Sequence, residues 1–294
     1  MAKRRTATDT PPGGLKDAKL DDLRAAIRLT REPGWNQVAA DWRLMLEAGD
    51  SFGLATPNGR LVASGLTVPF GGPFGWISMI LVTEPFRRRG LATYLMGRCI
   101  RALKARRLVP ALDATPAGRE VYRSLGFKDI YRITRFGAAA PDFGDEAMPP
   151  GVAVRRLGRK DIPTVAAYDR PIFGADRAFL IEHLRARRPA QAFIAVRGTK
   201  VCGYVLAREG QSSSQIGPLV ADDAATAASL LARSLKAGKG AVCIDVLDRH
   251  RAMRKRLTAS GFVAQFPFIR MIYKHDRPFD DVRRVVAIAG PELA

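Results

Sequence analysis

The sequence predicts an α/β protein made of two similar halves, each with a central sheet flanked by helices. A chain of 294 residues with 47% apolar and 26% charged side chains can form two ordinary globular cores. Short strand-like runs alternate with segments of helical periodicity. The order of these elements also repeats, because both halves end in a helix, a Gly-Phe pair (Gly126-Phe127 and Gly261-Phe262) and a strand.

In the first half, two helices are expected before the strands. Leu20, Leu23 and Ile27 recur at helical spacing within residues 17–30, and a second helix over 37–48 ends at Gly49. An opening strand cannot be placed clearly. The further elements are strands at 51–55, 60–70 and 76–82, a helix starting near 90, a strand at 108–112, a helix at 116–125 and a strand at 127–136.

The helix that starts near residue 90 has one apolar face, because Leu91, Leu95, Cys99 and Leu103 recur every four residues. The second half repeats the pattern of the first, starting with a strand. Its elements are a strand at 152–155, helices at 159–168 and 175–187, strands at 191–196, 200–208 and 215–220, a helix at 222–236, a strand at 241–246, a helix at 249–259 and a strand at 262–274.

These elements divide the chain into five segments. The expected division is a disordered N-terminal tail at 1–16, a first domain at 17–137, a linker at 138–151, a second domain at 152–276 and a C-terminal tail at 277–294. The N-terminus lacks the apolar stretch of a secretory signal. Residues 61–83 carry no charge, but repeated glycine and proline favour two strands around a turn over a membrane helix. A cytoplasmic location without a membrane partner is expected.

The net charge is +20, with a sequence pI near 10.7, and it is shared between the halves. Its simplest interpretation is an arginine-rich solvated surface. A nucleic-acid partner is not expected, because no basic stripe with interleaved aromatic residues is present. Cys99, Cys202 and Cys243 are far apart in apolar surroundings and are expected to be buried thiols. The histidines are scattered, so no metal site is expected.

The most informative segment is residues 82–93, where a buried strand runs through three arginines and a glycine into a helix. The start of a helix offers unpaired N–H groups and the positive end of the helix dipole. Gly90 and Ala92 allow a ligand to approach the backbone closely. These features are typical of a phosphate-binding turn, and a basic helix start on the surface is the alternative interpretation at this point.

The run Arg87-Arg88-Arg89-Gly90-Leu91-Ala92 resembles the pyrophosphate loop of the GNAT superfamily of acyl-CoA-dependent N-acetyltransferases. Residues 113–127 resemble the second signature of that family, with Tyr122 on its tyrosine and Gly126-Phe127 at its end. The departures are Thr115 at the asparagine position, Gly118 at the alanine position and Val121 at the leucine position. The whole chain is similar to the two-domain GNAT proteins, whose second acetyltransferase-like domain has diverged.

This resemblance implies tandem GNAT folds, each with a mixed, mostly antiparallel central sheet flanked by helices. It implies acetyl-CoA as cosubstrate and an amine acceptor that is a small molecule or a peptide. Tyr122 is the implied general acid for the leaving thiolate. The expected cofactor contacts are Ile80, Leu81, Val82, Arg87, Arg88, Arg89, Gly90, Leu91, Ala92, Thr93, Thr115 and Gly118.

The second half lacks both of these functional features. Asp222 and Asp223 stand where the first half has arginines, and they repel a pyrophosphate. Leu257 stands at the tyrosine position and cannot donate a proton. We therefore expect this half to keep the fold without the cofactor site and to supply one wall of the acceptor pocket.

Other parts of the mechanism stay open at this point. A backbone N–H near Ile80–Val82 is expected to stabilise the oxyanion. The general base is Asp113, Asp41 or water, and Asp113 could equally cap a helix. Trp35 and Asn36 are candidates for the acceptor side, whereas Trp42 is a core residue or a third such candidate.

Two other functions remain as alternatives. One is a non-catalytic acyl-CoA-binding or regulatory module, in which Tyr122 only packs. The other is a nucleic-acid binder, which the lack of stacking aromatic residues opposes. The acceptor and the oligomeric state cannot be derived from the sequence.

Overall fold

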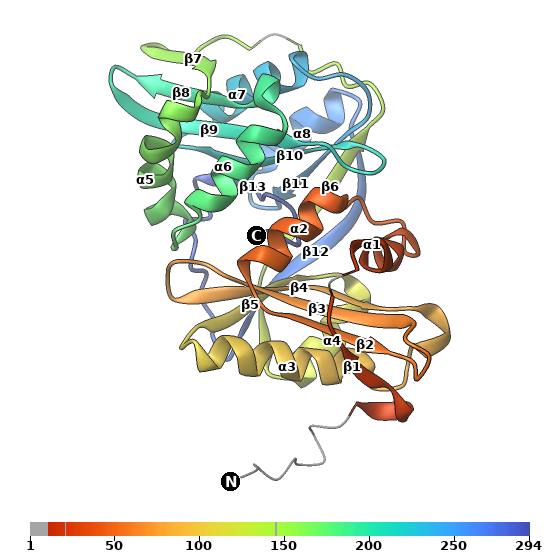
Figure 1. Ribbon diagram of the computed structural model, residues 1–294. Coiled ribbons are helices and arrows are strands. Elements are labelled where there is room, and N and C mark those ends of the chain that lie inside the picture. The colour runs from red at the N-terminus through yellow and green to blue at the C-terminus, as the bar shows by residue number, and fades with distance from the viewer. Residues whose placement is uncertain (1–10, 21, 145) are drawn as a thin grey trace. The chain divides into compact units, whose positions relative to one another are not determined.

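The computed structural model describes residues 11–20, 22–144 and 146–294 (Figure 1). These residues form two compact units. The first consists of the chain up to residue 69 together with 74–111, and the second consists of 70–73 together with 112–294. Each unit has its own set of paired strands and its own buried core.

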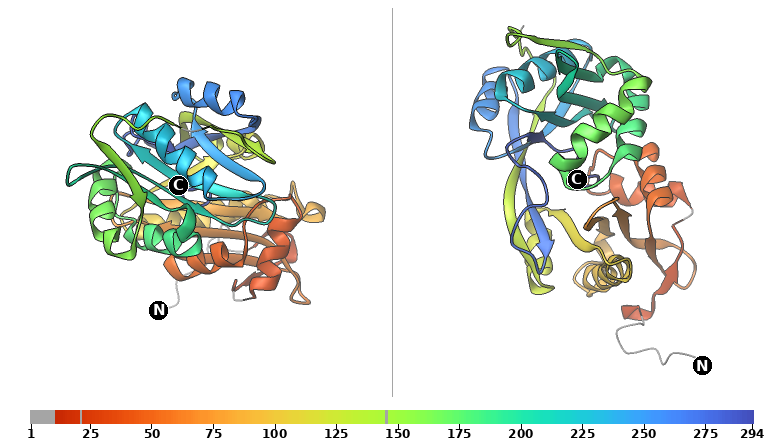
Figure 2. Two further views of the ribbon diagram at one scale, coloured as in Figure 1. Left: turned by 90° about the horizontal axis from the view of Figure 1, so that it is seen from above. Right: turned by 90° about the vertical axis from the view of Figure 1, so that its left-hand side faces the viewer.

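In the first unit, α3 lies on one face of the sheet and α1 and α2 lie on the other (Figures 1 and 2). Its elements are β1 (Lys16–Ala18), α1 (Leu23–Arg31), α2 (Ala39–Ala48), β2 (Ser51–Ala55), β3 (Leu61–Pro69), β4 (Phe74–Val82), α3 (Leu91–Ala105) and the start of β5 (Val109–Ala114).

The strands of this unit are antiparallel from β1 to β4. The last pair, β4 with β5, is parallel, and within this unit it pairs residues 74–76 with residues 109–111. The mixed, mostly antiparallel sheet expected from the resemblance is therefore confirmed. Leu91 and Leu95 of α3 are buried against Leu54, Val62 and Ala63, which confirms the predicted apolar face of that helix.

The second unit places α5 and α6 on one face of its sheet and α7 on the other (Figures 1 and 2). Its elements are the end of β5, α4 (Pro116–Ser124), β6 (Phe127–Ala138), β7 (Val152–Arg156), α5 (Ile162–Phe173), α6 (Ala178–Arg187), β8 (Phe193–Arg197), β9 (Lys200–Arg208), β10 (Ser214–Ala221), α7 (Ala224–Lys236), β11 (Val242–Leu247), α8 (Arg251–Ala259), β12 (Val263–Tyr273) and β13 (Val285–Ala287).

The strand order in this unit is β12-β6-β11-β13-β10-β9-β8-β7. The pair β10 and β11 is parallel, whereas neighbouring strands in this order pair antiparallel. Strand β6 ends the first half of the sequence repeat, yet it pairs with β11 and β12 of the second half. The expected domain limits of 17–137 and 152–276 follow the repeat in the sequence, whereas the compact units divide after residue 111.

Three terminal expectations differ from the structure. The helix expected from residue 17 begins at Leu23, because the Asp22 side chain accepts hydrogen bonds from the N–H groups of Arg24 and Ala25. Of the expected disordered tail, residues 1–10 lie outside the described residues, while residue 16 begins β1, which pairs with β2. Residues 277–294, expected as a tail, contribute β13, whose side chains are buried in the second sheet.

The uncharged run 61–83 forms β3, a turn and β4, as predicted. In the turn, Gly71 exchanges two backbone hydrogen bonds with Asp176, at 3.0 and 2.9 Å. A Cβ atom on Gly72 would lie 2.6 Å from the Cβ of Ala175, so glycine is required there. Among the described residues, no helix has the length and apolar character needed to cross a membrane.

A buried ion pair connects α5 and α6 of the second unit. The Arg177 guanidinium donates two hydrogen bonds to the Asp169 carboxylate, at 2.8 and 2.9 Å. The Tyr204 hydroxyl donates a third, at 2.6 Å. All three side chains are shielded from solvent. Removing one partner therefore leaves an unpaired charge in the core.

We predict that Asp169→Ala destabilises the second unit by about 3–5 kcal/mol, because Arg177 stays buried without its counter-ion. Urea unfolding followed by circular dichroism measures this loss. The control is Glu182→Gln, whose carboxylate is 54% exposed and lies 3.8 Å from an exposed Arg159. That variant should unfold like the parent, because exposed ion pairs contribute little. Equal unfolding of Asp169→Ala and the parent would contradict the prediction.

Candidate functional site

Strand β4 contains one extra residue just before the predicted cofactor contacts. Two of its residues, Met79 and Ile80, face the single residue Gly65 of β3. Met79 adopts a positive φ of 54°, and its carbonyl oxygen accepts a hydrogen bond of 2.8 Å from the Ser64 hydroxyl. Such a bulge interrupts the regular ladder and redirects the backbone that follows. It therefore lies where the sequence predicts an oxyanion contact.

Gly65, which faces this bulge, lies in a crowded position. A Cβ atom at this position would lie 2.8 Å from the Cδ1 atom of Ile80 and 3.3 Å from the sulfur of Cys99. The absent side chain lets Ile80 pack toward α3. The sequence analysis did not single out Ser64 or Gly65, because their effect depends on pairing between strands.

Helix α3 begins without a side-chain cap. Its N-cap residue is Gly90, in the left-handed conformation at φ 77°, which makes no side-chain cap hydrogen bond. Leu91 is buried in the core, Ala92 is half-buried and Thr93 is exposed. A Cβ atom on Gly90 would meet open space. The uncapped and exposed helix start has the geometry that the sequence predicts for phosphate binding.

Arg87 is held by another part of the first unit. Its Nη2 atom lies 3.3 Å from Oε1 of Glu32, and its Nε donates to the Val82 carbonyl oxygen at 3.1 Å. The same Glu32 carboxylate accepts the backbone N–H of Glu84 at 2.6 Å. Glu32 therefore fixes the entry to the loop. Local sequence patterns do not identify Glu32 as part of the site, because 52 positions separate it from Glu84.

The other two arginines of the loop present their charge to solvent. Arg88 is exposed and has a positive φ of 59°. The guanidinium carbon of Arg89 lies 5.2 Å from the centre of the Phe86 ring. Together with Gly90, these residues form an exposed cationic turn. An anion would meet both side-chain charge and backbone N–H groups there.

The remaining predicted site residues lie on α4, in the second unit. Thr115 is the N-cap, since its hydroxyl oxygen accepts the Gly118 N–H at 3.3 Å, and Pro116 occupies the first helical position. Tyr122 is half-buried, with its ring 6.3 Å from that of Phe127. A Cβ atom on Gly118 would lie 3.1 Å from the Tyr122 hydroxyl oxygen and closer still to the ring. Gly118 therefore gives the tyrosine ring its position along the helix.

Asp113 was a candidate for the general base or for a helix cap, and the second interpretation is wrong because Thr115 caps α4. The side chain of Asp113 is fully buried, and Arg270 of β12 donates to both of its oxygens at 2.8 Å. Burial raises the pKa of the Asp113 carboxyl, and the Arg270 guanidinium opposes this shift. Arg270 also lies 3.3 Å from Asp280, which accepts from the Tyr131 hydroxyl. Asp113 thus belongs to a buried network.

The second candidate base, Asp41, caps α2 in the first unit. Its carboxylate accepts the Val38 N–H at 2.8 Å, and the side chain is buried. Trp42 is fully buried, which supports its interpretation as a core residue. Trp35 and Asn36 are half-buried in the segment before α2.

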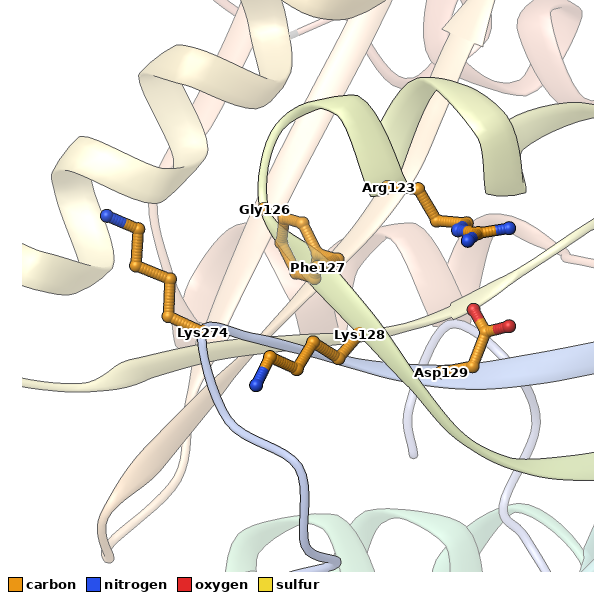
Figure 3. Close-up of a pocket in the computed structure, with 6 residues that line it drawn as sticks. All are labelled: Arg123, Gly126, Phe127, Lys128, Asp129 and Lys274. Atoms are coloured by element: carbon orange, nitrogen blue, oxygen red, sulfur yellow. The ribbon is translucent and has the colours of Figure 1, made fainter.

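A surface hollow of about 600 Å³ lies at the C-terminal end of α4 (Figure 3). Its first lining residue, Arg123, follows Tyr122 in the sequence. Figure 3 shows the side chains of Arg123 and Asp129 on one side of Phe127 and two lysines on the other. The Asp129 carboxylate accepts from Arg119 at 2.9 Å, which partly neutralises it. The lining residues are Arg123, Gly126, Phe127, Lys128, Asp129 and Lys274. The sequence analysis did not anticipate this cationic hollow.

The second half differs from the first at both corresponding positions. Leu257 of α8 is fully buried in the core. Asp223 is the N-cap of α7 and accepts the Thr226 N–H at 2.7 Å. Among the described residues, no group of three or more histidine, cysteine or acidic side chains is placed to bind a metal ion.

Two family models match the chain. Residues 19–127 match the acetyltransferase (GNAT) family, and residues 165–287 match an acetyltransferase (GNAT) domain. The two matches correspond to the two halves of the repeat. They include the β4–α3 loop of the first half and the β10–α7 loop of the second.

Relatives and solved structures agree with these matches. The chain is 22% identical over 243 residues to the uncharacterized N-acetyltransferase YitH of Bacillus subtilis, covering 82% of this chain and 85% of that protein. A protein of Pyrococcus horikoshii has the same fold, with a TM-score of 0.77, 19% identity and coverage of 99% of this chain and 100% of that one. A tandem GNAT protein from the clavulanic acid biosynthesis pathway has the same fold with a TM-score of 0.62 and 14% identity. The match covers 88% of this chain and 98% of that one. The chain belongs to the GNAT acetyltransferases and carries two GNAT domains in tandem.

Proposed function

We propose that this protein transfers an acetyl group from acetyl-CoA to the amine of a small molecule or peptide, and that its first half binds acetyl-CoA. The observation that carries this proposal is the uncapped, exposed start of α3 at Gly90. The loop of residues 83–90 connects this helix start to β4, whose ladder is interrupted at Met79 and Ile80. Phosphate groups and a thioester carbonyl need these two kinds of backbone donor.

The pyrophosphate of acetyl-CoA is assigned to the turn from Arg87 to Thr93. Arg88 and Arg89 supply exposed positive charge, whereas Arg87 mainly holds the loop through Glu32. The amide chain of the cosubstrate is assigned to the backbone of Ile80–Val82. On α4, the Thr115 oxygen caps the helix, which leaves its O–H to serve as a donor.

The reaction is direct acyl transfer. The nitrogen lone pair of a neutral amine attacks the thioester carbonyl carbon, and a backbone N–H near Ile80–Val82 stabilises the oxyanion. Collapse of this intermediate breaks the carbon–sulfur bond. Tyr122 then gives its proton to the departing thiolate. The products are an acetamide and the free thiol of CoA.

The amine must also lose a proton to a base. The contacts of the two acidic candidates support water in this role, because Asp113 is bound by Arg270 through both oxygens and Asp41 caps α2. Solvent then carries the proton away and returns one to Tyr122. This reaction requires no metal, nucleic acid or membrane partner, and we place it in the cytoplasm.

An acceptor screen tests the proposal. The full-length protein is incubated with acetyl-CoA and a panel of amines, and released thiol is measured with a chromogenic disulfide. Thiol release that depends on one class of amine supports acetyl transfer. CoA binding without turnover of any amine would instead favour a non-catalytic acyl-CoA-binding module.

The first prediction for this site concerns the helix start. Gly90→Glu should abolish CoA binding, because it places bulk and negative charge at the phosphate position. Calorimetric titration with CoA measures this. The matched control is Gly59→Glu, because Gly59 also has a positive φ and open space around its Cβ position. The control should bind CoA like the parent, although both substitutions strain the backbone. Unchanged affinity in Gly90→Glu would contradict the assignment.

The second prediction concerns the proposed general acid. Tyr122→Phe keeps the ring and removes the proton donor, so kcat should fall about 10- to 1,000-fold. KM for acetyl-CoA should change little, because the hydroxyl acts mainly in the transition state. Pre-steady-state thiol release measures both. The control is Tyr273→Phe, whose ring also packs against Phe127. Equal rates for the parent and Tyr122→Phe would remove this residue from the mechanism.

The third prediction concerns the position of that hydroxyl. Gly118→Ala should lower kcat about 10-fold, since the new methyl group displaces the Tyr122 ring and proton transfer depends on its geometry. Helix stability should not fall, because alanine favours helices. The control is Gly97→Ala on α3, where a Cβ atom has room 3.4 Å from Arg101. That variant should keep full activity. Unchanged kcat in Gly118→Ala would show that the ring position is not critical.

A further inference from the structure

Both halves contain two parallel strands that pair briefly and then separate. In the first half, β4 and β5 pair over residues 74–76 and 109–111. In the second half, β10 and β11 pair over residues 214–216 and 242–244. Both pairings span three residues, and in both halves the first strand leads into a long helix (α3 or α7). The two strand pairs are therefore equivalent, and their separation leaves backbone groups that need partners.

In the second half, β13 fills the space between the separated strands. On one side it is antiparallel to β10, with Leu219 opposite Ala287 and Val220 opposite Val285. On the other side it meets β11, with Val246 opposite Ala287. The Ile288 N–H continues this contact by donating to the Asp245 carbonyl oxygen at 3.1 Å. The side chains from 285 to 289 are all buried.

Residues of β10, β9 and the loop after β11 make close contacts with the segment 285–292. A Cβ atom on Gly217 of β10 would overlap the carbonyl oxygen of Ile288, so only glycine allows so close an approach. The buried Arg208 guanidinium donates to the Ala289 carbonyl oxygen and forms an ion pair with Glu292. At the other end of the segment, His250 Nε2 lies 2.9 Å from the Val285 carbonyl oxygen.

The start of α7, the helix that follows β10, is also filled by a group of the chain itself. The Asp223 carboxylate caps the start of α7, whereas Gly90 leaves the start of α3 without a side-chain cap. The neighbouring Asp222 accepts from the Tyr168 hydroxyl at 2.9 Å and lies 3.7 Å from Arg284. The carbonyl oxygen of Arg284 accepts the N–H of Ala221, the last residue of β10. One continuous segment thus reaches from the helix start into the space between the strands.

We propose that residues 284–289, together with Asp223, occupy in the second half the positions that acetyl-CoA takes in the first. The strand segment replaces the amide chain of the cosubstrate, and the carboxylate replaces its phosphate. The second half is therefore closed to CoA by its own chain and serves as a permanently filled copy of the site. This inference rests on the proposed function, which assigns acetyl-CoA to β4 and the start of α3.

Hydrogen–deuterium exchange of the full-length protein, with and without CoA, tests the inference. Without CoA, the amides of 285–288 should exchange at least 100-fold more slowly than in an unstructured peptide. Saturating CoA should slow exchange over 87–93 and leave 219–224 and 284–289 unchanged. Calorimetry should give one CoA per chain. Fast exchange of 285–288 without CoA, or slowing by CoA over 219–224, would overturn the inference. CoA that slows exchange in neither half would instead contradict the proposed function.

A pair of buried arginines provides the matched variants. Arg208→Gln weakens the contacts to Ala289 and Glu292 and should speed exchange over 285–288 about 10-fold, without affecting CoA protection of 87–93. Arg187→Gln is the control, because the side chain of Arg187 is only 7% exposed and donates to the carboxylate and the carbonyl oxygen of Glu209. Exchange over 285–288 should match the parent in that variant. Equal exchange in the two variants would show that Arg208 does not retain the segment and would count against the inference.

Discussion

The separation of two parallel strands is the constraint on which much of this structure depends. Once β10 and β11 diverge, the backbone donors and acceptors on their facing edges have no partners from each other. A buried amide or carbonyl without a partner costs about 1–3 kcal/mol, so several such groups in succession could not persist in a core. Strand β13 supplies the missing partners on both edges. In the first half, the same requirement supports the proposed assignment of the amide chain of the cosubstrate to β4.

The starts of α3 and α7 also carry backbone groups that need partners, and here a negative charge is a suitable partner. The first turn of a helix concentrates unpaired N–H groups and partial positive charge. At α7 the Asp223 carboxylate accepts one of them, the N–H of Thr226, from within the chain. Burial opposes ionisation of this carboxyl, but its hydrogen bonds with Thr226 and the charge of Arg197 hold its pKa below the usual value. At α3, Gly90 offers no side chain, and the adjacent arginines add more positive charge. This contrast supports the proposed phosphate site at α3 and the proposed lack of one at α7. This local difference says more about function than the net charge of +20.

Local sequence patterns were sufficient for nearly every helix and strand, because apolar periodicity and Gly or Pro boundaries are local signals. They failed for β1 and β13, which are three residues long and show no periodicity. They also failed for interactions between distant residues. Glu32 fixes the loop at Glu84, and Arg270 neutralises Asp113 across 157 positions. The loop of the site could be predicted, because it is continuous in sequence, whereas the partners that orient it could not.

The pairing of β6 with strands of the second half links the proposed general acid to that half. Strand β6 follows α4 directly and is paired on one edge with β11 and on the other with β12. Arg270 of β12 also neutralises Asp113, two residues before the N-cap of the helix that carries Tyr122. A chain cut in the linker would leave β6 with two unpaired edges and Asp113 with a buried charge lacking its partner. The second half therefore forms the support on which the proposed general acid of the first half is positioned, whether or not it contacts the acceptor.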